Sequence, residues 1–190
     1  ELKATGTATP RHYTSATVLF TDFVNFTALS ARLTPEQLIT TLNEYFLAFD
    51  EIAERNRLEK IKTIGDAYMC VGGIPVTNET HATDAVQAAL EMVEWVKAYS
   101  RQSPHAIFKE MRIGIHTGQV VAGVVGKNKF AYDVWGDAVN IASRLEEYGE
   151  SNRINISSTT FEAVRHRFAC EQRGTIEVRS KGKIEMYFVL

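Results

Sequence analysis

The sequence has little of what marks several common classes of protein. Its 190 residues include only two cysteines, Cys70 and Cys170, too few for a secreted disulfide scaffold, so reduced thiols in the cytoplasm are expected. The net charge is −2 and no long run of Lys or Arg occurs, which predicts no nucleic-acid partner. The longest apolar run, residues 120–125, is far shorter than the ~20 residues of a membrane span, so this segment is not expected to insert into a membrane.

Familiar catalytic and nucleotide-binding motifs are also missing. Residues 123–127 (GVVGK) superficially resemble a phosphate-binding loop, but the first glycine is absent and Asn128 stands where Ser or Thr would bind Mg²⁺. Neither G-x-G-x-x-G nor G-x-S-x-G occurs, and the histidines and cysteines show no zinc-site spacing. These absences exclude several functions without identifying one.

The chain begins without an initiator Met or a signal-peptide pattern, so we expect it to be a segment of a longer protein. Residues 1–12 show no periodicity and are typical of a linker stub. The remaining residues, 13–190, have ordinary globular composition and the length of a single domain.

Apolar periodicity predicts an α+β domain with a ferredoxin-like βαββαβ core. A helix should begin at Thr34, because Pro35 and Gln37 follow it as capping signals. The core elements are expected at residues 17–20 (strand), 35–52 (helix), 58–64 and 67–72 (a hairpin), 81–101 (helix) and 111–116 (strand).

Additions are expected C-terminal to this core. A turn at residues 117–118 should separate the strand at 111–116 from the run at 120–125. Later elements are expected at 130–135 (strand), 137–148 (helix), 154–156 (strand) and 159–166 (helix), followed by two closing strands. The order of elements predicts an α+β fold with C-terminal additions.

Two carboxylates could meet at one edge of this core. Asp22 follows the first predicted strand, and Asp66 lies at the tip of the predicted hairpin. In a βαββαβ core these positions can lie side by side, and a carboxylate pair suits Mg²⁺ with substrate phosphate oxygens. The competing interpretation is local, since Asp is common in turns for its hydrogen bonds to the backbone.

Other polar residues stand at informative positions. Lys62 lies on a strand between apolar neighbours, and Asp133 lies within an apolar strand. Asn140 and Arg144 share one face of a predicted helix, where Arg offers a planar fork suited to phosphate. Each could equally be an ordinary solvated side chain.

Four blocks of sequence stand in a particular order and spacing. They are residues 18–27 (VLFTDFVNFT), 59–69 (EKIKTIGDAYM), 112–118 (RIGIHTG) and 132–144 (YDVWGDAVNIASR). Together they resemble the catalytic domain of the class III nucleotidyl cyclases, and the resemblance covers residues 13–190. It implies the class III cyclase fold for that range.

The resemblance implies a metal site and a base-reading pair. Asp22 and Asp66 match the two metal-binding aspartates, and the backbone carbonyl of Phe23 matches a further ligand, for two divalent ions, Mg²⁺ or Mn²⁺. Lys62 and Asp133 match the pair that reads adenine in adenylyl cyclases. Lys can donate to N1 of adenine and Asp can accept from its N6 amino group. Guanine-reading members of the family have Glu and Cys at these positions.

The resemblance also implies residues for the ribose and the phosphates. Asn140 matches the residue that orients the ribose, and Arg144 the one that stabilises charge on the α-phosphate in the transition state. Arg112 matches a residue that reaches the terminal phosphates. A basic residue late in the family's sequence binds the triphosphate, and either Arg179 or Lys181 could take this role here.

One position in the phosphate-approach loop departs from the family. Asn25 stands where the family usually has Gly. A change here could alter the affinity for substrate or metal.

The implied activity is an adenylyl cyclase that converts ATP to cyclic AMP and pyrophosphate, by attack of the 3′-hydroxyl on the α-phosphate with the help of two metal ions. In this family the metal aspartates face the base-reading and Asn/Arg residues across a dimer interface. Both sets occur in this chain, which implies a head-to-tail homodimer with shared sites. The parent protein is expected to carry an upstream sensor or membrane region, with this domain in the cytoplasm.

Two alternatives remain open on the sequence. A guanylyl cyclase is disfavoured by Lys62 and Asp133. A catalytically silent, nucleotide-binding regulatory domain is disfavoured because the expected polar positions are filled.

Overall fold

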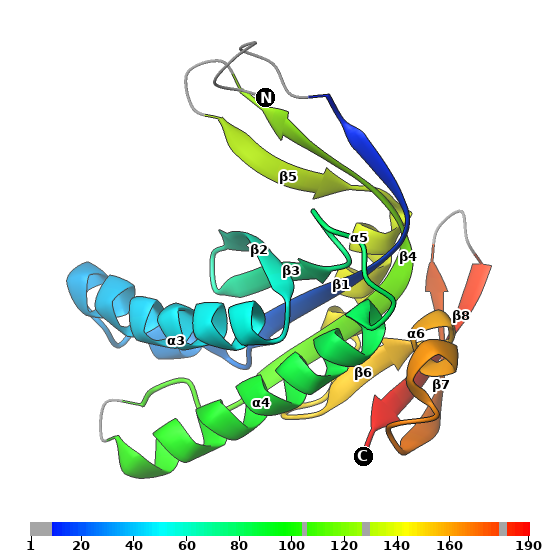
Figure 1. Cartoon of the computed structure of the whole chain (residues 1–190). Helices are drawn as coiled ribbons and strands as arrows, with labels where there is room; N and C mark the ends of the chain where they lie inside the picture. Colours follow the sequence, from blue (N-terminus) through cyan, green and yellow to red (C-terminus); the bar gives the residue numbers. More distant parts are fainter. Residues whose placement is uncertain (1–8, 104–105, 127–129, 179–181) are drawn as a thin grey trace.

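The structure, a computed structural model, describes residues 9–103, 106–126, 130–178 and 182–190. Its helices and strands are β1 (Arg11–Phe23), α2 (Phe26–Ser30), α3 (Pro35–Arg55), β2 (Leu58–Ile64), β3 (Ala67–Gly72), α4 (His81–Gln102), β4 (Met111–Val125), β5 (Ala131–Trp135), α5 (Asp137–Glu147), β6 (Ile154–Ser157), α6 (Ser158–Val164), β7 (Cys170–Val178) and β8 (Gly182–Val189). Figure 1 shows their arrangement.

The strands form one mixed sheet in the order β2-β3-β1-β4-β6-β8-β7, with β5 paired to β4. The first four strands of this order and the helices α3 and α4 make the predicted ferredoxin-like core. β6, β8 and β7 extend the sheet beyond β4, and they are the expected C-terminal additions. The α+β fold is therefore confirmed.

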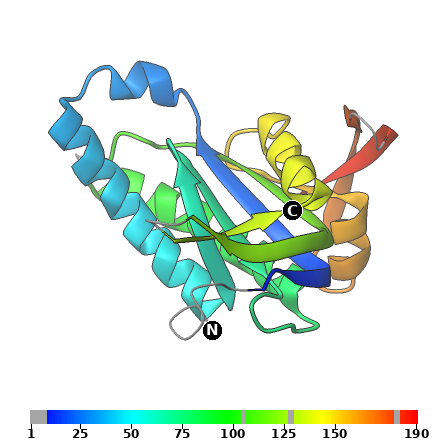
Figure 2. The same ribbon diagram turned by 90° about the horizontal axis from the view of Figure 1, so that it is seen from above.

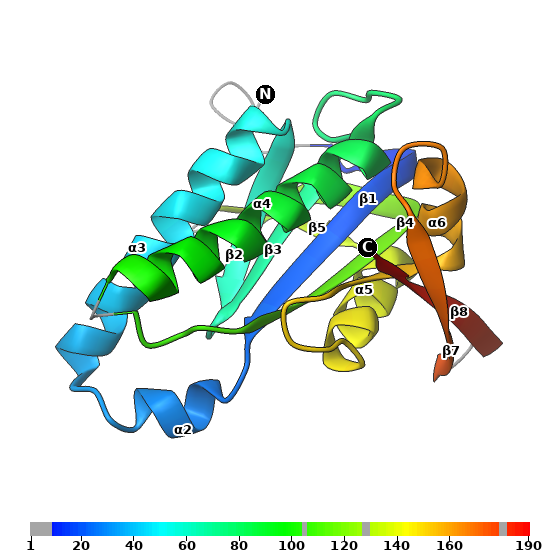
Figure 3. The ribbon, with the colours of Figure 1, turned by 90° about the horizontal axis from the view of Figure 1, so that it is seen from below.

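Helices cover both faces of the sheet. Figure 3 shows α3 and α4 lying across one face, where Leu19 of β1 packs with Tyr45, Phe49 and Met92. On the other face α5 packs its alanines against Val18 and Phe20 of β1. Successive side chains of β1 thus pack into the apolar clusters on opposite faces of the sheet, as the two-residue period of a strand requires.

The helix α3 begins as predicted. The Thr34 hydroxyl accepts from the Gln37 backbone N–H at 3.3 Å, and the Gln37 side chain accepts from the Thr34 N–H at 2.9 Å. These reciprocal bonds satisfy donors that the first helical turn leaves without partners.

The predicted turn at residues 117–118 is wrong. β4 continues through it as one 15-residue strand, because Thr117 and Gly118 pair with Thr17 and Ala16 of β1. β1 is likewise longer than the predicted run at 17–20: it begins at Arg11, which pairs with Ala122. The short helix α2 was not predicted.

The extended ends of β1 and β4 shape the molecule. Figure 1 shows them bending away from α3 and α4 together with β5. Figure 2 shows β5 crossing above the β2–β3 hairpin, where an ion pair joins Lys62 of β2 to Asp133 of β5. None of the helices in the described ranges is long and apolar enough to cross a membrane.

Candidate active site

The two aspartates singled out in the sequence meet at one edge of the sheet. β1 and β3 run antiparallel, so Asp22 near the end of β1 lies beside the start of β3, where Asp66 occupies the preceding turn. The Phe23 N–H donates to Asp66 Oδ2 at 3.3 Å. Burial, together with a hydrogen bond and like charge from Asp22, raises the pKa of Asp66 to about 7.

This carboxylate pair opens into a pocket of about 360 Å³. The pocket is lined by Asp22, Phe23, Asn25, Phe26, Thr27, Ala28, Asp66 and Arg112. Two carboxylates that repel each other, beside an open polar cavity, suit a hard divalent cation with oxygen ligands. The residues present therefore fit the predicted metal ions.

Arg112 lies against the predicted metal ligand. It sits opposite Asp22 in the β1–β4 ladder, and its Nη2 donates to Asp22 Oδ2 at 2.7 Å. Its Nε donates to Glu146 Oε1 of α5 at 2.8 Å. The guanidinium thus brings positive charge to the same pocket in which the terminal phosphates were expected.

Lys62 and Asp133, the second pair of residues singled out in the sequence, form an ion pair. Lys62 Nζ lies 2.6 Å from Asp133 Oδ2, while Asp133 Oδ1 accepts from the Val134 N–H at 2.8 Å. The side chain of Asp133 is 17% exposed and that of Lys62 is 38% exposed. A donor on β2 and an acceptor on β5, both partly buried, therefore stand side by side.

Asn140 and Arg144 lie one turn apart on α5, and both are exposed. Arg144 Nη1 donates to Glu147 Oε2 at 2.5 Å. Among the described residues that line the Asp22–Asp66 pocket, none is Asn140, Arg144, Lys62 or Asp133. The pocket thus gathers the predicted metal residues and Arg112, whereas the predicted nucleoside residues lie outside its lining.

Asn25 adopts a left-handed backbone conformation, with φ 59° and ψ 26°, immediately before α2. Glycine adopts this conformation at no steric cost, and Asn is among the few other residues that tolerate it. This backbone conformation explains why Asn can stand at position 25, where the family usually has Gly. Arg179 and Lys181 lie outside the described residues.

Glu146 was not singled out in the sequence. It follows Ala138 and Ala142 at four-residue spacing, so it takes a position on the buried face of α5. A carboxylate on such a face needs a partner, and that is the signal that could have revealed it. Burial raises its pKa, and Arg112 opposes that rise.

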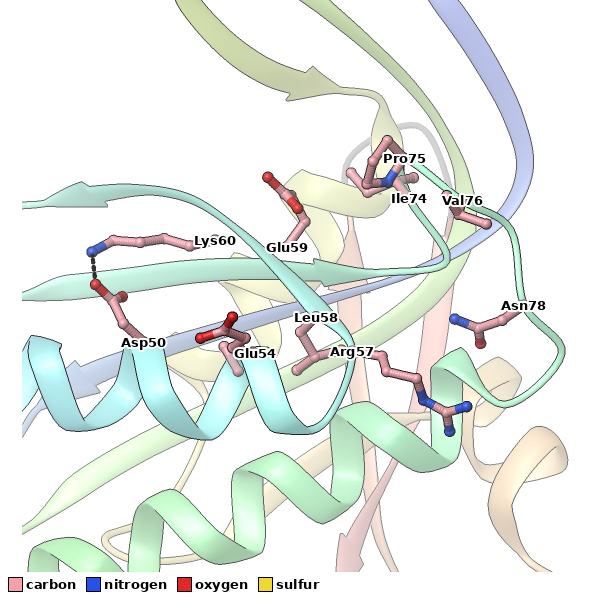
Figure 4. Close-up of a pocket in the computed structure, with 11 residues that line it drawn as sticks. Asp50, Glu54, Arg57, Leu58, Glu59, Lys60, Ile74, Pro75, Val76 and Asn78 are labelled. Carbon is pink, nitrogen blue, oxygen red and sulfur yellow. Dashed lines mark hydrogen bonds and ion pairs between the residues drawn. The ribbon is translucent and has the colours of Figure 1, made fainter.

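A further cavity is lined by none of these residues. With a volume of about 560 Å³, it lies between the end of α3, β2 and the loop after β3 (Figure 4). Its basic side chains already have partners: Lys60 pairs with Asp50 at 2.7 Å, and Arg57 donates to Asp84 at 2.8 Å. It contains no residue predicted for the active site.

The fold, with a carboxylate pair beside a polar pocket and a Lys–Asp pair on β2 and β5, is the one expected for a class III nucleotidyl cyclase domain. The family of adenylate and guanylate cyclase catalytic domains matches residues 8–190, and the chain belongs to this family.

Relatives include both kinds of cyclase. Atrial natriuretic peptide receptor 2 from Homo sapiens is 42% identical over 194 residues, covering 100% of this chain and 18% of the receptor. An adenylate cyclase from Mycobacterium tuberculosis is 38% identical over 178 residues, covering 94% of this chain and 40% of that protein. The guanylate cyclase domain of RhGC from Catenaria anguillulae, solved in complex with GTP, is 36% identical with a TM-score of 0.87, and the match covers 95% and 98% of the two chains. The chain thus spans well under half the length of these two curated relatives.

Proposed function

We propose that this chain is an adenylyl cyclase domain that converts ATP to cyclic AMP and pyrophosphate. The observation that carries the choice of ATP is the Lys62–Asp133 pair. Its ammonium can donate to N1 of adenine and its carboxylate can accept from the N6 amino group. Guanine has a donor at N1 and an acceptor at C6, so it would leave both protein groups mismatched, and such a mismatch discriminates between the two bases.

Asp22, Asp66 and the carbonyl of Phe23 would hold the divalent ions. Bound there, Mg²⁺ or Mn²⁺ would neutralise phosphate charge and favour deprotonation of the ribose 3′-hydroxyl. Arg112 brings a fixed cation to the same pocket, where it would bind the β- and γ-phosphates through its planar donors.

Asn140 and Arg144 serve the reacting end of the substrate. Asn140 would orient the ribose, so that its 3′-oxygen stands in line with the bond from the α-phosphorus to the pyrophosphate oxygen. As the new oxygen–phosphorus bond forms, the bond to pyrophosphate breaks, and the 3′-hydroxyl proton leaves to water or to the substrate. Arg144 would stabilise the charge that develops on the α-phosphate.

Two chains would build each site. The metal and phosphate residues share the Asp22–Asp66 pocket, and the base, ribose and transition-state residues lie outside its lining, which supports a site completed by a second chain. Ile64 and Trp135 lie two residues along their strands from Lys62 and Asp133, on the same side of each strand. They are 55% and 42% exposed, which suits a surface that a second copy covers.

The domain would belong to a larger protein that supplies its regulation, as its partial coverage of the curated relatives suggests. ATP as substrate agrees with the cytoplasmic location expected from the sequence.

The test is a turnover assay of the purified chain with ATP and with GTP, each with Mg²⁺, with Mn²⁺ and with chelator. Cyclic AMP from ATP that requires the metal is the expected result. Preferential formation of cyclic GMP would overturn the assignment of substrate in favour of a guanylyl cyclase. Nucleotide binding without turnover would make the chain a silent regulatory domain.

A paired substitution tests the base-reading residues directly. The double variant Lys62→Glu, Asp133→Cys should lower the ATP-to-GTP ratio of kcat/KM by on the order of 100-fold, because each protein group then complements guanine. Lys60→Glu is the matched control, since Lys60 pairs with Asp50 on the other side of the hairpin. An unchanged ratio in the double variant would contradict the assigned roles.

A further inference from the structure

The guanidinium of Arg112 has two anchors of different kinds. Its Nη2 donates to Asp22 at the open pocket, and its Nε donates to Glu146 at 2.8 Å. The Glu146 side chain is 9% exposed, against 23% for Asp22. Glu146 does not line the Asp22–Asp66 pocket, whereas Arg112 does. Glu146 therefore holds the inner edge of the guanidinium and leaves the outer edge facing the pocket.

The backbone of α5 holds Glu146 close to β4. A Cβ on Gly114 would lie 2.1 Å from the Glu146 N and 2.4 Å from the Ala142 O, so helix and strand touch where only glycine fits. Arg112 and Gly114 are two residues apart on β4 and share this face. The buried Asn155 also donates to the Leu145 carbonyl at 2.7 Å. These contacts fix the backbone of α5 at Glu146 relative to β4, and the carboxylate placed there accepts from the Arg112 Nε.

The outer anchor, Asp22, is the one whose bond to Arg112 would weaken when a metal ion binds. Asp22 is an oxygen donor for a divalent ion, and a carboxylate that binds a cation has less negative charge to share with Arg112. If Asp22 were the only partner of Arg112, the guanidinium would then lose its anchor as substrate binds. Glu146 keeps one bond to the Nε throughout, and the Nη groups stay free to change partners.

We propose that Glu146 is a positioning residue that holds Arg112 by its Nε, so that the Nη donors pass from Asp22 to the polyphosphate oxygens of the nucleotide. The inference rests on the proposed function, since it requires a polyphosphate substrate. Arg112 contacts the substrate and Glu146 acts only through it.

The test is steady-state kinetics of Glu146→Gln together with the double variant Glu146→Gln, Arg112→Ala. The glutamine keeps the shape and a weak acceptor but loses the charge. KM for ATP should rise about tenfold while kcat falls by less than about threefold, because ground-state phosphate binding weakens. In the Arg112→Ala background the same substitution should change neither constant, whereas a merely structural role would give the same loss in both backgrounds.

Glu150→Gln is the matched control, because Glu150 lies just beyond α5, is exposed, and among the described residues pairs with Arg153 and Arg173 rather than with Arg112. It should leave both constants unchanged. Denaturant midpoints of all variants check that they fold.

A binding measurement separates this inference from the proposed function. Inorganic tripolyphosphate with Mg²⁺, titrated by calorimetry, should bind Glu146→Gln about tenfold more weakly than the wild-type chain. That result would support the inference even if the wild-type chain formed no cyclic nucleotide. Equal KM and equal tripolyphosphate affinity in wild type and Glu146→Gln would overturn it, whether or not the chain is a cyclase.

Discussion

Asn25 lies in the loop that borders the Asp22–Asp66 pocket, and its backbone conformation constrains which residues can stand there. Its φ of 59° lies in the left-handed region, which β-branched side chains avoid. We expect Asn25→Gly to leave the free energy of unfolding within about 0.5 kcal/mol of wild type and Asn25→Val to lower it by about 1–2 kcal/mol. Urea unfolding measures both.

Thr27→Val is the control for this pair. Thr27 is also exposed, but it lies in α2 with helical backbone, so the same side chain should cost less there. Equal losses at positions 25 and 27 would mean that the left-handed conformation is not what constrains the loop.

His116 is a residue whose environment makes stability depend on pH. Its Nδ1 lies 2.7 Å from the Ser157 hydroxyl in a buried position, and burial lowers its pKa from 6.5 to about 4. The unfolded chain therefore binds a proton more readily than the folded chain. The stabilising effect of neutral His116 is complete above pH 6.5 and is lost as pH falls toward 4, a change of about 3 kcal/mol.

The measurement is the free energy of unfolding of wild type and His116→Gln at pH 7.5 and pH 4.5. Stability should fall less on acidification in the variant, by about 2–3 kcal/mol. The exposed His166 provides the control, His166→Gln, which should follow wild type. The same acid sensitivity in all three proteins would refute the role of His116.

At the scale of elements, the contact between α5 and β4 depends on Gly114. An added Cβ would collide with backbone atoms, which cannot move as a side chain can. Gly114→Ala should lower the free energy of unfolding by about 3 kcal/mol or more, and should also lower activity because α5 carries Asn140 and Arg144. Gly123→Ala on the same strand is the control: its nearest neighbour would be Pro10 Cβ at 3.6 Å, an ordinary contact. Comparable stability of the two variants would contradict the close approach.

Elements with local signals were predictable from the sequence. The capping box at Thr34, the Gly65-Asp66 hairpin turn and the apolar periodicity of α3 and α4 act over a few residues, and the structure has each of them. The prediction of a turn at Thr117-Gly118 was wrong because a short polar pair is typical of a turn, whereas pairing with β1 overrides that local preference.

In the candidate site too, residues with a local sequence signal were predictable and a residue without one was not. Asp22, Asp66, Lys62 and Asp133 were found because they lie in recognisable motifs, and the structure brings them together in two pairs. Glu146 was missed because its importance depends on Arg112, which is 34 residues away in sequence and meets it only across the α5–β4 contact. A partner at that distance leaves no local signal in a single sequence.

At the scale of the whole molecule, the proposed sharing of sites between chains predicts that activity belongs to an assembly. Asp22→Ala removes a proposed metal ligand and Arg144→Ala removes the proposed transition-state cation, so each variant should be inactive alone. If sites are shared head to tail, a mixed dimer carries both lesions in one site and none in the other. Random pairing of equal amounts should then restore about a quarter of wild-type activity, and specific activity should fall on dilution.

The control is a mixture of Asp22→Ala with Asp66→Ala. These lesions belong to the same proposed set, so in a mixed dimer each site still lacks one proposed metal ligand, and no activity should return. Recovery in the Asp22→Ala and Arg144→Ala mixture alone would support shared sites. No recovery, although sedimentation shows that mixed dimers form, would mean that each chain completes its own site.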